Sequence, residues 1–230
     1  MTPGEPLIRW DWIADHSGEI ALRLGEHLLL TGIAVGVGLA LAFAIGIPIA
    51  RRPGLYSAAV WIAGILYTIP SLALFALLIP FTGLSLLTAE IGLVSYTLLV
   101  LIRNVVAGLR GVPEDVLESA RGMGYSARGL LWRVELPLAA PVILAGVRTA
   151  TVTTIGLTTV TALIGQGGLG QFILDGLQRF FSTPLLLGAL LSVALAVASD
   201  GALALVERAL TPWRRDIPLR ARVGPGAAPV

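Results

Sequence analysis

The residue types that could carry chemistry are few in this sequence. The 230 residues include no Cys, two His and no Lys, because all 16 basic residues are Arg. Without Cys there is neither a thiolate nucleophile nor a thiolate metal site. Without Lys there is no Walker A loop, so any ATP that drives this protein has to be bound by another chain. The sequence therefore predicts no catalytic residue, no metal site and no cofactor of its own.

Four groups of residues remain as candidates for function. They are a polar central segment, an aromatic and hydroxyl cluster around a proline, two isolated charges of opposite sign, and a glycine fingerprint. In the chain these are Glu118 to Pro137, then Tyr67 with Thr68, Pro70 and Ser71, then Arg148 with Asp200, and finally Gly165-x-Gly167-x-x-Gly170.

The elements that position these residues are membrane helices. The chain is 56% apolar and only 13% charged, whereas a soluble domain carries about 25% charged residues. A disordered chain is excluded by the same apolar content. Because roughly 20 apolar residues cross a bilayer as a helix, we predict an all-α integral membrane protein with five transmembrane helices, at about 28–50, 55–79, 86–108, 141–164 and 184–206.

The arginines predict the orientation of these spans. Most of them lie at positions 51–52, 103–133 and 208–222, all on one side of the predicted membrane. The positive-inside rule makes that side cytoplasmic. We therefore expect the N-terminus outside and the C-terminus in the cytoplasm.

The spans also predict the division of the chain. Residues 1–27 form an extracytoplasmic segment with a short surface helix, because its tryptophans suit the headgroup region. No secretory cleavage pattern is present, so the first span is expected to remain. Residues 28–207 form the membrane domain, with a cytoplasmic loop at 109–140. The Arg-rich tail at 208–230 lies near anionic lipid or serves only as a topology anchor.

The cytoplasmic loop carries clear helix signals. A proline followed by two acids predicts a short helix over about 113–121, which Gly122 and Gly124 end. Ser126 can cap a second helix, which Pro137 is expected to close.

Three interpretations of this helix pair are open from the residues alone. A DNA-reading pair is disfavoured, because a duplex can hardly reach a segment held between two spans, so we expect no nucleic acid. A solvated loop that carries topology charge is the plain alternative. A protein dock is the third, with Ala120, Gly122 and Gly124 offering a small-residue surface to a partner's groove.

The loop resembles the EAA signature of the membrane subunits of bacterial ATP-binding-cassette importers. That signature is Glu-Ala-Ala, three residues, Gly, nine residues and Ile-x-Leu-Pro. This chain reads Glu118-Ser119-Ala120, Gly124 and Val134-Glu135-Leu136-Pro137 with every spacing kept, Ser119 and Val134 being small departures.

The resemblance spans about residues 19–200 and implies a type I importer permease core in the bacterial inner membrane. It implies as partners a cytoplasmic ATPase dimer that holds ATP and Mg, a second permease chain (a copy or a paralogue), an extracytoplasmic solute-binding protein, and membrane lipids. It also implies coupling to the ATPase through Glu118, Ser119, Ala120, Arg121, Gly124, Leu136 and Pro137.

Within that family the chain is most similar to permeases for osmoprotectants such as glycine betaine, choline and carnitine. The similarity rests on residues 67–74, Arg103-Asn104, 144–150 and 162–170. A permease for methionine or sulfonates remains an alternative, as does an ion-coupled secondary transporter. An intramembrane enzyme is disfavoured, because the predicted spans offer no Cys and no His well inside them to activate a nucleophile.

The polar residues within the spans suggest separate roles. Arg148 and Asp200 lie at similar depth in antiparallel spans, so we predict that they pair, with snorkelling to the interface as the alternative.

Glu90 lies at the outer edge of the third span and is expected to be solvated. The fingerprint at 165–170 lacks a preceding strand, and we interpret it as a tight turn at the outer mouth rather than a dinucleotide site.

Pro70 should kink the second span and free backbone carbonyls. Its neighbours Tyr67, Thr68 and Ser71 would then offer polar groups and an aromatic face at mid-membrane. A quaternary ammonium solute binds through cation–π contacts, so these four residues are the predicted translocation pathway, with simple helix packing as the alternative.

Overall fold

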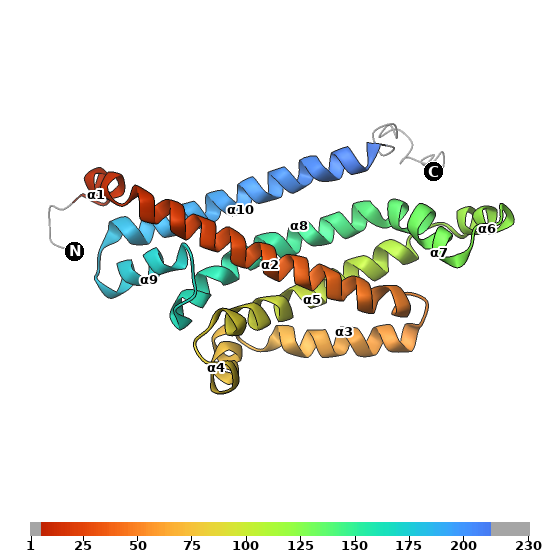
Figure 1. Cartoon of the computed structure of the whole chain (residues 1–230), viewed down its shortest axis with the longest axis horizontal. Helices are drawn as coiled ribbons and strands as arrows, with labels where there is room; N and C mark the ends of the chain where they lie inside the picture. The colour runs from red at the N-terminus through yellow and green to blue at the C-terminus, as the bar shows by residue number, and fades with distance from the viewer. Residues whose placement is uncertain (1–5, 213–230) are drawn as a thin grey trace, which may run out of the picture.

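A computed structural model describes residues 6–212, and that range is helical with no β-strand. Figure 1 shows long helices lying side by side, with α6 and α7 at one end of the molecule and α1 and α9 at the other. In chain order the elements are α1 (Trp10–Asp15), α2 (Ser17–Ile49), α3 (Pro53–Thr68), α4 (Ser71–Thr82), α5 (Leu86–Arg110), α6 (Glu114–Gly122), α7 (Ala127–Leu130), the π-helical turn η1 (Leu131–Glu135), α8 (Leu136–Val160), the 3-10 turn η2 (Thr161–Ile164), α9 (Gly170–Gln178) and α10 (Ser182–Leu210).

The helices account for the predicted spans. By length and composition α2, α5, the continuous segment 127–164 and α10 can each cross a membrane. The pair α3 and α4 makes the fifth span if it is counted as one, and it is bent by 95° at its break. The all-α membrane fold is therefore confirmed.

The second span differs most from its prediction, because Pro70 breaks the helix rather than kinking it. Ile69, the residue before the proline, is extended at φ −66° and ψ 126°. A residue before proline is pushed out of the α region, and proline itself has no N–H to donate. Helix α3 therefore ends at Thr68, and α4 begins in a new direction at Ser71.

The N-terminal boundary also differs. The predicted surface helix is only the six residues of α1, and α2 begins at Ser17 rather than near 28. The charges in the first turns of α2 sit on one helical face, where Arg23 pairs with Glu19 at 3.7 Å and with Glu26 at 3.0 Å. Pairs three and four residues apart stabilise an exposed helix, so the helix continues past the predicted interface.

The core lies where α2, α5 and α8 meet. Glycines allow the close approach: a Cβ on Gly38 would lie 2.0 Å from Oγ1 of Thr97, and one on Gly146 would lie 2.4 Å from Cβ of Asn104. Such small-residue contacts drive helix packing in membranes. Helix α2 therefore packs on α5, and α5 packs on α8.

The connection between the third and fourth spans is more continuous than predicted. Ser126 caps α7 as expected, its Oγ accepting from the N–H of Gly129 at 3.2 Å. Pro137, however, does not close the second helix. It is the second residue of α8, directly after the π-helical turn η1, and the helix continues through it. Residues 127–164 are thus helical throughout.

The opposite end contains a helix that the sequence did not predict, α9, between the fourth and fifth spans. The glycine fingerprint forms a tight turn before it, as expected. Gly165 adopts a left-handed φ of +77°, and a Cβ on Gly170 would lie 2.2 Å from the carbonyl oxygen of Thr159. Part of the predicted tail at 208–230 belongs to α10, which ends at Leu210, and residues 213–230 lie outside the described range.

Candidate functional site

The polar central segment folds into one small body, here called the α6–η1 unit (residues 114–135). Its interior is an apolar cluster of Leu117, Ala120 and Leu130, with Val134 packed against it, and Val112 from just before α6 completes the cluster. The prediction that Ala120 offers a small-residue surface is wrong, because this residue is only 2% exposed. Its methyl group instead lets α6 pack closely on α7, so the unit is expected to move as one piece.

The rest of the EAA segment is divided between surface and interior. Glu118, Ser119 and Arg121 are exposed on α6, and Gly124 makes the turn to α7 with φ +85°. Arg121 donates to Glu114 at 2.7 Å, and this hydrogen bond raises the pKa of the Arg121 guanidinium above its ordinary value. Leu136 and Pro137 are half-buried at the start of α8.

Three exposed apolar side chains on the α6–η1 unit lie outside the sequence predictions. Met123 is 72% exposed and Trp132 is 62% exposed, and Tyr125 lies between them in the chain with 37%. The sequence signal that could have found them is the presence of three large apolar residues in a polar loop.

The α6–η1 unit is tied to the end of α2 by polar contacts that the sequence did not indicate. Arg51, just after α2, donates to Glu135 in the π-helical turn. Arg110, at the end of α5, donates to the carbonyl of Ala50 at 2.6 Å, and its guanidinium carbon lies 4.5 Å from the centre of the Tyr56 ring. A cavity of about 350 Å³ lies between these elements.

A second cavity lies at the break between α3 and α4, and its volume is about 460 Å³. The sequence-predicted residues Tyr67, Thr68, Pro70 and Ser71 all line it. The lining also includes residues that the sequence did not predict, namely Ile69, Tyr96, Thr153, Gly156 and Leu157.

The two tyrosines shape this cavity. The hydroxyl of Tyr96 donates to the carbonyl of Ile69, the group that the helix break leaves without an intrahelical partner. The rings of Tyr67 and Tyr96 are 5.8 Å apart and meet edge to face at 66°. This arrangement offers aromatic faces and hydroxyl groups but no charged side chain, which suits weak binding of a cation.

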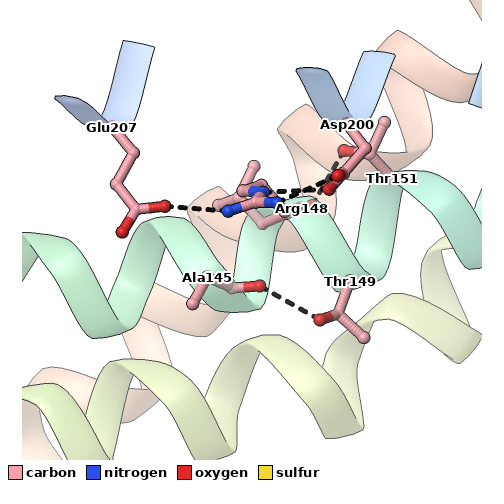
Figure 2. A network of polar contacts seen from close by, with 7 residues as sticks. Ala145, Arg148, Thr149, Thr151, Asp200 and Glu207 are labelled. Carbon is pink, nitrogen blue, oxygen red and sulfur yellow. Dashed lines mark hydrogen bonds and ion pairs between the residues drawn. The ribbon is translucent and has the colours of Figure 1, made fainter. Parts of the chain in front are cut away.

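Arg148 and Asp200 are brought together between α8 and α10, as Figure 2 shows. The contact is bidentate: Nε donates to Oδ1 and Nη2 donates to Oδ2, both at 2.9 Å. Glu207, which the sequence reasoning missed, accepts from Nη1 at 3.1 Å. It lies seven residues after Asp200 and hence on the same helical face, which was an available signal.

The exposed face of α8 connects the charged cluster with the tyrosine cavity. A groove of about 600 Å³ beside Arg148 and Asp200 is lined along α8 by small and hydroxyl residues, among them Thr149 and Thr153. Thr153 also lines the tyrosine cavity. The two hollows therefore adjoin along one helix.

Two further polar residues are more buried than the sequence suggested. The carboxylate oxygens of Glu90 are buried and have no hydrogen-bond partner among the described residues, so the expectation of a solvated side chain is wrong. His27 is completely buried, with Nε2 placed 3.0 Å from the carbonyl of Ile155. Across residues 6–212 no group of three or more His, Cys, Asp or Glu is placed to hold a metal ion.

Comparison with known proteins identifies a close set of relatives. A family model described as "Binding-protein-dependent transport system inner membrane component" matches residues 32–212. The choline transport system permease protein OpuBB of Bacillus subtilis (strain 168) is 38% identical over 201 residues, which cover 87% of this chain and 93% of that protein. The glycine betaine/carnitine/choline transport system permease protein OpuCB of the same organism is 36% identical over 201 residues, with the same coverage.

A solved structure has the same fold. The MetNI methionine ABC transporter, in an inward-facing conformation, matches with a TM-score of 0.72 and 24% identity. The match covers 84% of this chain and 96% of the other.

Proposed function

The chain belongs to the inner membrane components of binding-protein-dependent transport systems, and from this premise we propose that it is the permease subunit of an ATP-driven importer for osmoprotectants. The solute class is quaternary ammonium compounds such as choline, glycine betaine and carnitine. The observation that carries this choice is the tyrosine-lined cavity at the α3–α4 break, in a chain whose relatives OpuBB and OpuCB are named for these solutes.

The solute path follows the exposed face of α8. Tyr67 and Tyr96 offer aromatic surface to a trimethylammonium group, and Thr68, Ser71 and Thr153 offer hydroxyls to its polar end. No carboxylate lines this cavity, so a cation would be held briefly and released. A second permease chain, either a copy or a paralogue, closes the path from the other side.

The charged cluster of Arg148 with Asp200 and Glu207 sets the spacing of the helices beside this path. It satisfies an arginine that would be costly if unpaired in a membrane span. It thereby fixes α10 against α8, on which both the groove and part of the tyrosine cavity lie.

Energy enters through the α6–η1 unit. Glu118, Ser119 and Arg121, on its exposed side, contact a cytoplasmic ATPase dimer that holds ATP and Mg, since this chain has no Lys for a Walker A loop. Gly124 keeps the turn of the unit, while Leu136 and Pro137 carry its motion into α8. Ala120 contributes only by packing inside the unit.

We propose an orientation for this arrangement. The α6–η1 unit faces the cytoplasm, as the arginines around it favour. The N-terminus and the glycine turn at 165–170 then lie outside, where a solute-binding protein delivers its cargo. The end of α10 then lies on the cytoplasmic side.

The test is reconstitution of the permease with its neighbouring ATPase and binding protein in liposomes. We expect choline, glycine betaine or carnitine to stimulate ATP hydrolysis and to accumulate inside the liposomes. Stimulation by methionine or a sulfonate alone would overturn the solute class but keep the permease. Uptake that continues without the ATPase and stops with an uncoupler would instead indicate an ion-coupled carrier.

A further inference from the structure

We infer that the ion pair between Arg51 and Glu135 is a positioning device that transmits motion of the α6–η1 unit to the tyrosine-lined cavity. This inference rests on the proposed function. Glu135 occupies the variable position of the Ile-x-Leu-Pro part of the EAA signature, and Arg51 lies outside that signature. Neither residue lines the cavity.

The placement of the pair in the chain is the first step. Arg51 lies two residues before α3 begins, and Glu135 lies directly before α8 begins. The far end of α3 supplies Tyr67 and Thr68 to the cavity, and α8 supplies Thr153 from its opposite side. At 1.5 Å per residue the two helices span about 24 Å and 27 Å from the pair to the cavity. The pair therefore connects the starts of α3 and α8, and residues further along both helices line the cavity.

The chemistry of the pair is the second step. The side chain of Glu135 is 8% exposed, whereas that of Arg51 is 63% exposed. A buried carboxylate needs a charged partner, and an arginine provides one through charge-assisted hydrogen bonds. Glu135 is thus bound to the α2–α3 corner, residues 50–52, whenever the pair is intact, while the side chain of Arg51 can move into solvent.

The surroundings of the pair are the third step. Arg110 holds the carbonyl of Ala50 from α5 and so fixes the corner itself. On the other side the α6–η1 unit has its own apolar interior, and its residue Leu131 also packs against the main core. Between the corner and the unit lies the cavity of about 350 Å³, so their apolar contact is incomplete. The ion pair spans this gap.

The form of the helix at Glu135 is the fourth step. Residues 131–135 adopt a π-helical turn between α7 and α8. Such turns occur frequently at functional sites, and they are a common place for a helix to bend. A push on α6 therefore reaches α8 through the chain itself. It reaches the start of α3 through Arg51 and Glu135, beside the contact of Arg110 with the Tyr56 ring.

The experiment measures solute transported per ATP hydrolysed in the reconstituted complex. We expect E135Q and R51Q each to lower this ratio by about tenfold, within the range usual for coupling between sites. The double variant should lose no more than either single one, because both remove the same contact. R51K keeps a charge at this position and should retain most of the ratio. D11N, which removes an exposed pair at the other end of the chain, is the matched control and should leave the ratio unchanged.

The outcomes separate the pair from the proposed function. If the wild-type complex shows no quaternary ammonium uptake, the proposed function fails first. If the wild type transports and both single variants keep its ratio, the pair has no coupling role. Loss of the bound ATPase, or an equal fall in hydrolysis and uptake, would also overturn the inference, since it would make the contact merely structural.

Discussion

The tyrosine cavity leads to a prediction about one ring. The chain has no Cys, so T153C places a single thiol in the cavity wall. Choline bound beside Tyr67 should protect this thiol from a maleimide. Changing Tyr67 to Leu keeps a large apolar side chain but removes the aromatic face. Changing it to Phe keeps the face and removes only the hydroxyl.

The size of the effect follows from the exposure of the ring. A cation–π contact contributes about 0.5–1 kcal/mol at exposed sites and about 2 kcal/mol when desolvated. Tyr67 is 42% exposed, so a value near 1 kcal/mol is expected. Since about 1.4 kcal/mol corresponds to tenfold in affinity, Tyr67→Leu should raise the half-protecting choline concentration about fivefold.

The assay is maleimide labelling of the T153C permease over a choline titration, with and without the Tyr67 changes. Tyr67→Phe should protect like its parent. The uncharged isostere 3,3-dimethylbutan-1-ol should protect poorly, because it lacks the charge that the ring attracts. Equal protection by this alcohol, or an unchanged titration in Tyr67→Leu, would refute the cation–π reasoning.

Three further predictions concern stability and assembly. Asp200→Asn removes one of the two acceptors and the negative charge that face Arg148 in a membrane span. Less folded complex should therefore be recovered in gel filtration, and full recovery with full uptake would discard the role of the pair. Gly170→Ala should lower the melting temperature in detergent by several degrees, because the new Cβ meets backbone atoms and overpacking costs about 1–3 kcal/mol. Gly201→Ala is the control, because a Cβ there has open space and should leave the melting temperature unchanged. Equal melting temperatures for the two variants would contradict the close packing at Gly170. A hydrogen bond from Arg9 lowers the pKa of Asp11, so the stabilisation from this contact is present above the ordinary pKa and is lost as the pH falls through the lowered pKa. Because the pair is exposed, Asp11→Asn should leave the melting temperature at neutral pH unchanged. A clear drop in the melting temperature would contradict this expectation.

Local signals in the sequence were sufficient for the elements and for part of the site. Apolar length located the membrane helices, and Ser126 marked a helix start because its side chain can accept from its own next turn. The matched depths of Arg148 and Asp200 were enough to suggest their pairing, because two antiparallel spans impose that geometry.

Contacts between remote segments could not be predicted in the same way. Nothing local links Arg51 to Glu135, because their approach depends on how α2 ends against the π-helical turn. Tyr96 was missed because its partner is a carbonyl that is freed only when the helix breaks at Pro70. Ala120 was misplaced because the small size that suits a docking surface equally suits a packed interior.

The most direct test is cross-linking of the ATPase to a single cysteine introduced into the α6–η1 unit. In this chain S119C is exposed on α6, and G18C lies at the opposite end in open space. With a short cross-linker in native membranes, S119C should capture the ATPase, and G18C should not. Capture by neither, or by G18C alone, would contradict the claim that the α6–η1 unit is where ATP hydrolysis acts on this permease.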